Sequence, residues 1–179
     1  MSIQVRPKII YYIDVISRTT GHIVSWFTLL MVVSSFTVVT LRYGFNIGSI
    51  ALQESIGYFH AFIFMIGAAY TLKNDEHVRI DIFYRKMSAR NQALVNLLGS
   101  LFLLIPMCVF IFVESFDYVM NSWAIQEASS EAGGIPLVYL IKTTILIMPV
   151  LVVNQAIAII LQKIQFLRSP PQQDEPDNA

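Results

Sequence analysis

Four apolar runs, each close to the length of a membrane span, dominate the chain. They cover about residues 22–41, 50–72, 93–113 and 137–164, and polar segments separate them. A transmembrane helix needs about 20 predominantly apolar residues, because each residue adds about 1.5 Å and the hydrocarbon core is about 30 Å thick. The pattern therefore predicts an all-α integral membrane protein whose four transmembrane helices lie within residues 22–167.

Prolines and small residues interrupt the apolar pattern. Pro106 in the third run and Pro149 in the fourth predict a kink or an interruption, which neighbouring polar groups can tolerate in a membrane helix. In the second run, Gly57 and Ala61 are four residues apart, and the Gly67-Ala68-Ala69 segment follows. Small residues allow helix backbones to approach closely, so both places are predicted helix-packing positions.

The segments outside the spans differ in character. Residues 1–21 mix basic and apolar side chains, and they could form an amphipathic helix on the membrane surface or simply extend the first span as a helix. Residues 73–92 combine basic and aromatic side chains, which suggests a second segment lying on the surface. Residues 168–179 are rich in proline and acidic side chains and predict a disordered tail.

Composition agrees with a membrane protein, since 55% of residues are hydrophobic, 13% are charged and the mean hydropathy is +0.61. The charges are also segregated. With four spans, one side of the membrane holds ten of the twelve Lys and Arg residues, at positions 6, 8, 18, 73, 79, 85, 86, 90, 163 and 168. The other side holds only two basic residues, Arg42 and Lys142, together with five carboxylates: Glu54, Glu114, Asp117, Glu127 and Glu131. The positive-inside rule therefore places both termini and the 73–92 loop in the cytoplasm.

The candidate chemistry is sparse. A haem shared by two helices needs histidines at one depth, but His22 starts the first span, His60 lies about 18 Å from the cytoplasmic end of the second, and His77 is in a loop. No histidine or carboxylate group has metal-ligand spacing, and no nucleophile–base pair or phosphate-binding loop occurs. The single cysteine, Cys108, is expected to be a buried core residue. We predict no catalytic residue, no cofactor and no metal, hence no enzyme, and no nucleic-acid partner.

A transport path through this chain alone is not predicted either. The first three spans have no charged residue at their centres, and the interrupted spans lack internal symmetry. Asn154 and Gln155 in the fourth span are better suited to hydrogen bonds between helices. The chain therefore resembles a helper subunit more than a carrier.

Residues 52–81 are the strongest candidate for gripping a partner. Glu54 at the start could pair with Arg42 or remain a solvated carboxylate, and the His77–Asp81 segment at the other end could dock or be an ordinary basic loop. We expect Glu54→Ala or Arg79→Ala to weaken subunit association or uptake while membrane insertion stays intact, as measured by co-purification and solute uptake. The candidate partner contacts are Arg42, Gln53, Glu54, Gly57, Ala61, Gly67, His77, Arg79 and Asp81.

Several short motifs occur in a fixed order between about Arg42 and Gln162. They are Arg42-Tyr43, Gln53-Glu54, Gly67-Ala68-Ala69-Tyr70, His77-Val78-Arg79-Ile80-Asp81, Ser122-Trp123, Gly133-Gly134-Ile135-Pro136 and Ile141-Lys142. In this order, the chain resembles the small membrane subunit of the tripartite ATP-independent periplasmic (TRAP) transporters, the DctQ-like family. Lys73-Asn74-Asp75-Glu76 is more acidic than that pattern, and the N-terminal twenty residues and the tail after Leu167 have no counterpart in it.

The resemblance implies a multi-pass subunit of the bacterial inner membrane with both termini in the cytoplasm. It implies a large multi-span permease subunit as partner, and a periplasmic substrate-binding protein that delivers an organic acid. It also implies uptake driven by an ion gradient, with this chain as a scaffold and without substrate residues of its own.

Two other functions remain open at this point. The chain could be a self-sufficient small channel or exporter acting as a homo-oligomer, with the kinked third and fourth spans lining the pore. It could also anchor a redox enzyme in the membrane, which predicts a haem spectrum and is disfavoured by the depths of the histidines.

Overall fold

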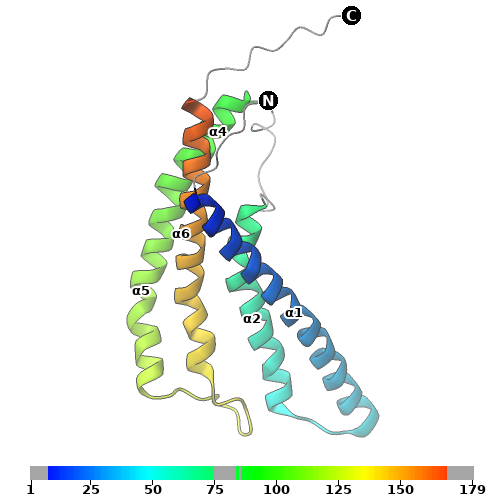
Figure 1. The fold of residues 1–179 in the computed structure, drawn as a ribbon. Helices are drawn as coiled ribbons and strands as arrows, with labels where there is room; N and C mark the ends of the chain where they lie inside the picture. The colour runs from blue at the N-terminus through cyan, green and yellow to red at the C-terminus, as the bar shows by residue number, and fades with distance from the viewer. Residues whose placement is uncertain (1–7, 75–83, 85, 169–179) are drawn as a thin grey trace, which may run out of the picture.

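The computed structural model describes residues 8–74, 84 and 86–168, and long helices dominate it (Figure 1). The elements are α1 (Lys8–Phe45), α2 (Ile50–Lys73), α4 (Ala89–Gly99), the π-helical η1 (Ser100–Leu104), α5 (Ile105–Ala124) and α6 (Val138–Arg168). Within the described residues, α4, η1 and α5 form one continuous rod, so four helical rods are long and apolar enough to cross a membrane. The predicted all-α, four-span fold is therefore confirmed; the direction in which it crosses the membrane stays a prediction.

The rods lie side by side in the order α5, α6, α2 and α1, with α6 in a central position (Figure 1). In the most apolar window of α6, 39% of the residues are buried, against 6% in each of the other rods. Ala69 of α2, Cys108 of α5 and Val152 of α6 form the core cluster that joins these three helices. Cys108 is thus the buried core residue that its apolar surroundings predict.

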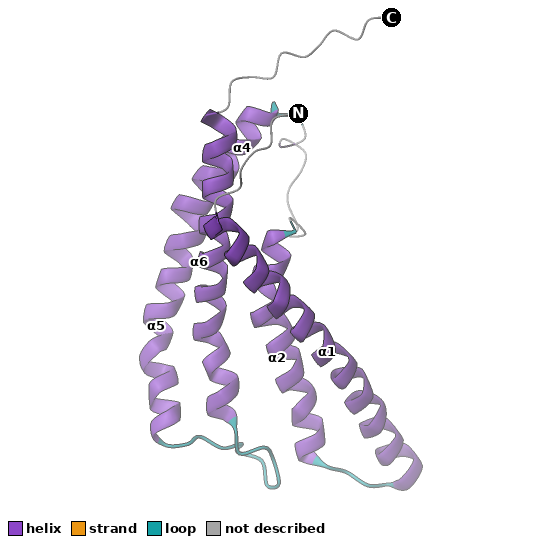
Figure 2. Cartoon of the chain, in the orientation of Figure 1, coloured by secondary structure: helices purple, strands orange, loops and turns teal. Residues whose placement is uncertain are grey.

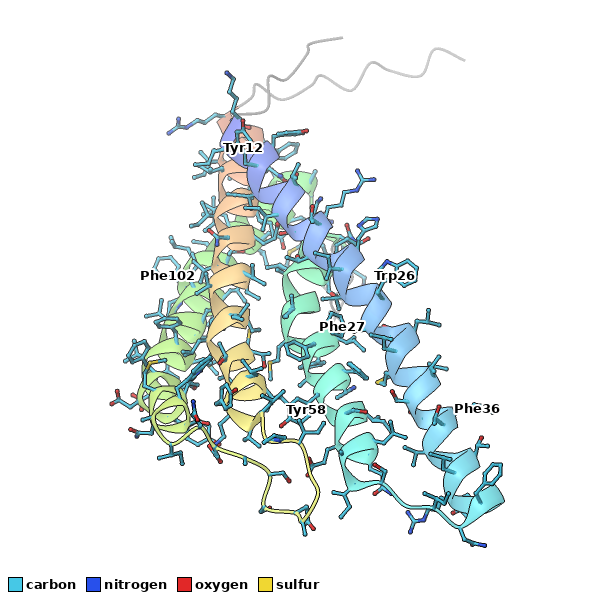
Figure 3. All side chains as sticks on the ribbon, turned by 60° about the horizontal axis from the view of Figure 1, so that its bottom comes forward. Tyr12, Trp26, Phe27, Phe36, Tyr58 and Phe102 are labelled. Carbon is cyan, nitrogen blue, oxygen red and sulfur yellow. The ribbon has the colours of Figure 1, made fainter. Side chains whose placement is uncertain are left out.

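Helix α1 crosses the others diagonally, starting over α6 and running down beside α2 (Figure 1). Gly21 permits the close approach of α1 to α2, because a Cβ atom there would lie 2.5 Å from Cγ of Tyr70. Further along, the Phe27 ring packs against Phe59 and Phe62 of α2, with centroids 5.9 and 5.4 Å away. Figure 3 shows Phe27 between the two helices.

A buried polar contact ties α1 to α6 near the end that holds the start of α1. The Ser17 hydroxyl donates to Oε1 of Gln155 at 2.7 Å, and both side chains are buried. Nε2 of Gln155 lies 3.4 Å from Oδ1 of Asp14, and Lys73 of α2 donates to the Asp14 carbonyl at 2.9 Å. The predicted interhelical role of Gln155 is confirmed. Its neighbour Asn154 is exposed instead.

Three of the predicted spans are shorter than the helices that contain them. Residues 8–21 extend the first span as a helix, in line with the second of the two alternatives above. The helix that contains the third predicted span does not end near Val113, because it continues through Glu114 and Asp117 to Ala124. Hydropathy detects only the part of a helix that suits the membrane core, and no glycine or proline stops the chain between residues 107 and 124.

The two prolines within the spans have different effects. Pro106 follows the π-helical residues Ser100–Leu104, so the predicted irregularity takes the form of a π-bulge that absorbs the missing backbone donor. Pro149 does not interrupt its helix, because α6 continues on both sides of it and the ring is buried. The predicted break in the fourth span is therefore wrong.

The described ends of the rods also group the basic side chains. The start of α1, the end of α2, the start of α4 and the end of α6 lie at one end of the molecule (Figure 1). Arg42 and Lys142 lie toward the other end, which we call the loop end because it carries the 125–137 loop. In the predicted surface segment 73–92, residues 75–83 and 85 fall outside the described residues, and residues 89–92 belong to α4. In the predicted tail, Arg168 ends α6 and the residues after it fall outside the described part.

Candidate functional site

The loop of residues 125–137 joins α5 to α6 and extends beneath α6 toward the start of α2 (Figure 2). Its backbone is fixed at both ends. Gln126 has a φ of 47°, and the Glu127 amide donates to the Ser122 carbonyl at 3.0 Å, which closes α5. The Val138 amide donates to the Glu127 carbonyl at 3.1 Å, so α6 starts directly beside the end of α5.

Glu54, in the first turns of α2, holds this loop from the side. Its Oε1 accepts a short hydrogen bond from the Ser129 hydroxyl, and its Oε2 accepts one from the Ile135 amide at 2.7 Å. A carboxylate that accepts from a backbone amide forms a charge-assisted hydrogen bond, which is stronger than a bond between neutral groups. The Glu54 side chain of α2 therefore bonds to both segments of the loop, the one at Ser129 and the one at Ile135.

Two glycines let the loop take this shape. Gly133 has a φ of 81°, in the left-handed region that glycine adopts at little cost. A Cβ atom on Gly134 would lie 2.8 Å from Oε1 of Glu54 and 2.6 Å from Cβ of Ser129, so only glycine fits beneath the carboxylate. The Gly134 amide donates to the Glu131 carbonyl at 3.0 Å and completes the turn.

Lys142, one turn into α6, ties the other side of the loop. Its Nζ lies 2.5 Å from Oε2 of Glu127 and 4.1 Å from the centre of the Tyr118 ring of α5. The lysine thus makes an ion pair and a cation–π contact at once. Beside it, Nε1 of Trp123 donates to the Thr143 hydroxyl at 2.8 Å, and the Trp123 ring meets the Tyr139 ring edge-on at 4.7 Å.

The arrangement is a mechanical latch, which we call the loop latch and define by Glu54, Ser129, Gly134 and Ile135. It binds α2 to the α5–α6 pair through side chains that are distant in sequence. Among residues 8–74, 84 and 86–168, no group of histidine, cysteine and carboxylate side chains is placed to hold a metal ion. What this geometry can do chemically is to fix the relative position of helices.

Comparison with known proteins assigns the chain to a family. The profile of the DctQ component of tripartite ATP-independent periplasmic transporters matches residues 31–166, which are 136 of the 179 residues. The chain belongs to the DctQ family. It is thus a small permease subunit of a TRAP transporter and a multi-pass membrane protein.

A curated relative carries the same description. Over 99 residues, the chain is 27% identical to a protein of Haemophilus influenzae whose name is that of a TRAP transporter small permease protein. The match covers 53% of this chain, and it spans about 60% of the length of that relative. No solved structure matches the chain.

The loop latch joins motifs that carry the DctQ resemblance but are far apart in sequence. Glu54 comes from the motif that opens α2, and Gly134 and Ile135 come from the turn before α6. Trp123 and Lys142, from two more motifs, flank the same loop. Four of these motifs therefore meet around the 125–137 loop.

The predicted contact residues differ in their partners and in their burial. The Glu54 carboxylate accepts hydrogen bonds from Ser129 and Ile135 of the loop. Of the two alternatives left open for it, the ion pair with Arg42 is not formed, and Arg42 is exposed. A Cβ atom on Gly67 would lie 3.7 Å from Cγ1 of Val24, so this predicted packing position of α2 faces α1. A Cβ atom on Gly57 would meet nothing within 4 Å, so no helix among the described residues packs closely there.

The remaining predicted contact residues are exposed, partly buried or outside the residues that the structure describes. Gln53 is exposed and Ala61 is partly buried. His77, Arg79 and Asp81 fall outside the described residues, so their docking role stays a prediction.

Sequence reasoning missed Ser129, Glu127 and Lys142 as members of the site. Lys142 could have been found from its position, because it is one of only two basic residues on its side of the membrane and an acidic loop precedes it. Ser129 gave no such signal, since its contact with Glu54 joins residues 75 positions apart.

The Glu127–Lys142 pair makes the loop sensitive to acid. The hydrogen bond from the Lys142 ammonium lowers the pKa of Glu127 below its ordinary value of 4.5. A carboxyl group whose pKa is depressed in the folded state stabilises that state above its unfolded pKa, and the contribution disappears as the pH falls through the folded value. We expect acidification below about pH 4.5 to loosen the loop, and Glu127→Gln to reduce this dependence. The remaining dependence belongs to Glu54, because the hydrogen bonds from Ser129 and Ile135 also lower the pKa of its carboxyl group.

Trp123 fluorescence can measure this change, because its indole contacts both Thr143 and Tyr139 of α6. Trp26 is the other tryptophan, so the titration is made in a Trp26→Phe background. A Glu127→Gln protein that keeps the full acid transition would show that another group controls the loop.

Proposed function

We propose that this DctQ subunit braces a large multi-span permease subunit in the bacterial inner membrane. In this proposal, the loop end faces the periplasm, where a substrate-binding protein delivers an organic acid to the permease. An ion gradient drives uptake, and the small subunit keeps its own helices in a fixed arrangement while the permease moves.

The observation that carries the proposal is the loop latch. Glu54 bonds to Ser129 and to Ile135 in the two segments of the 125–137 loop. Helix α2 therefore cannot shift relative to the α5–α6 pair without breaking a charge-assisted hydrogen bond. At the opposite end, Gln155 joins α6 to α1 through Ser17. A small helical protein that is tied at both ends suits a scaffold.

The interior supports a role without solute binding. In the described part of the chain, the buried polar side chains are Ser17, Ser100, Ser122, Thr144 and Gln155. None of them carries a charge, and an organic acid would need cationic or amide-rich partners within the membrane. This favours a permease partner that holds the solute.

The energy source and the solute class rest on the family. The name of the DctQ component describes a transporter that is independent of ATP, which favours uptake driven by an ion gradient. The organic-acid solute and the binding protein follow from the motif resemblance. The segregation of basic residues supports a cytoplasmic location for the end of the molecule opposite the loop end.

The test uses the tagged, full-length chain in its native membrane. Mild detergent extraction is expected to recover a large multi-span permease with it, and deletion of the chain is expected to abolish binding-protein-dependent uptake. Recovery of the chain without a permease would overturn the proposal. Solute or ion flux in liposomes that contain only this chain would favour the homo-oligomeric channel instead.

A further inference from the structure

One side of α2 faces away from every other helix of the chain. Gln53, Gly57, His60 and Phe64 are exposed, and their spacing of four, three and four residues places them on one face. We call this face the α2 stripe. Phe64 is 68% exposed, and a Cβ atom on Gly57 would meet no atom of the described residues within 4 Å.

His60 makes this face unusual. It is ten residues after Ile50, so it lies about 15 Å along a helix of 24 residues, close to the middle of the span. Its ring stacks near Phe64 of the same helix, with centroids 6.3 Å apart. Within the described part of the chain, its ring nitrogens have no hydrogen-bond partner. An imidazole at this depth that faced lipid would have no group to bond, which is costly.

The outer face of α1 provides the contrast. It exposes large apolar side chains, and Figure 3 shows Trp26 and Phe36 pointing away from the other helices. Three of its hydroxyl groups satisfy themselves within the helix: Ser25 donates to the His22 carbonyl, Thr37 to Val33 and Thr40 to Phe36. That face suits lipid, whereas the α2 stripe presents an unsatisfied imidazole.

Gly57 adds a steric argument. Small residues on exposed faces of membrane helices let a second helix approach closely, and polar side chains on the same face hydrogen-bond across the contact. Gly57 lies one turn from His60, and it serves no close approach within this chain. One helix that packed against Gly57 could therefore also supply a hydrogen-bond partner for the His60 imidazole.

We propose that the α2 stripe binds a transmembrane helix of the large permease subunit, which crosses at Gly57 and supplies a polar side chain that hydrogen-bonds the His60 imidazole. The inference rests on the proposed function for the identity of the partner. The stripe starts at Gln53, next to Glu54, so the loop latch holds the helix that makes this contact. The brace and the contact surface are then two sides of α2.

The test compares variants of the full chain in the assembled complex. His60→Leu removes the hydrogen bond and is expected to weaken association with the permease by about threefold to tenfold. His60→Gln keeps hydrogen-bonding ability and is expected to restore most of it. Gly57→Leu fills the crossing point and is expected to weaken association more than His60→Leu does. Phe36→Leu, on the outer face of α1, is the matched control and is expected to change nothing.

The isolated chain gives the readout that separates contact from folding. Because His60 is exposed and a Cβ atom on Gly57 would meet no described atom within 4 Å, His60→Leu and Gly57→Leu are expected to leave its thermal unfolding in detergent unchanged or slightly improved. Equal association of wild type, His60→Leu and Gly57→Leu with the permease would overturn the inference while the proposed function stands. A Gly57→Cys variant that cross-links to a second copy of this chain, and not to the permease, would also overturn it. Absence of the permease from wild-type preparations would instead overturn the proposed function.

Discussion

Glu54→Ala is expected to free the 125–137 loop and to reduce uptake strongly, although the protein still inserts into the membrane. The alanine removes both acceptors at once, so the Ser129 hydroxyl and the Ile135 amide lose their partner. Hydrogen exchange at the Ile135 amide is expected to accelerate on the order of tenfold, because a bond to a charged acceptor is lost. Mass spectrometry of the loop peptide measures this directly.

Glu131→Ala is the matched control for this experiment. It also removes one carboxylate at the loop end, but the Glu131 side chain is exposed and only its backbone takes part in the turn. Glu131→Ala is expected to leave both exchange and uptake near the wild-type values. If the Ile135 amide exchanges at one rate in wild type and Glu54→Ala, the loop does not depend on Glu54 and the bracing argument fails.

The membrane spans could be predicted because the bilayer imposes a simple requirement on sequence. Apolar runs near 20 residues are sufficient to find α1, α2, the α4–α5 rod and α6, and an even number of spans brings the basic ends together. The helix ends could not be predicted in the same way. Residues 8–21 and 114–124 are too polar for the hydropathy signal, yet their backbone hydrogen bonds continue the helix.

The site was only half predictable, because its contacts are tertiary. Glu54 could be singled out as a carboxylate at the end of a span, and the nearest cation in sequence, Arg42, was the obvious partner. A backbone amide of a distant loop takes that place instead, since Ile135 is held in position by the turn at Gly133 and Gly134. Sequence distance gives no hint of such a partner.

The packing of glycines between helices was also only partly predictable from the sequence. The pattern in the second run predicted close packing at Gly57, but among the described helices the close approach to α2 is made at Gly21, which precedes the predicted first span. A single sequence shows that a glycine could be approached closely, but not which helix approaches it. The answer depends on the diagonal course of α1, which brings Gly21 against Tyr70 and leaves Gly57 free.

Gly21→Ala is therefore expected to destabilise the isolated chain, by about 1–3 kcal/mol as for other overpacked cores. The added methyl group would lie 2.5 Å from Cγ and 3.0 Å from Cβ of Tyr70. These atoms are close to the backbone, so the ring cannot swing away as a flexible chain end could. Thermal unfolding of the purified chain in detergent, followed by circular dichroism, measures the loss.

Gly57→Ala provides the control, because both substitutions replace a helical glycine by alanine. Alanine is the better helix former by about 1 kcal/mol, so Gly57→Ala is expected to be neutral or stabilising where its methyl group meets open space. A second change, Tyr70→Ala, should make Gly21→Ala harmless, since it removes the atoms that clash. The two substitutions must then be strongly non-additive, as expected for residues in direct contact. Additive losses would mean that α1 and α2 do not meet at Gly21, and the position of α1 over α6 would lose its support.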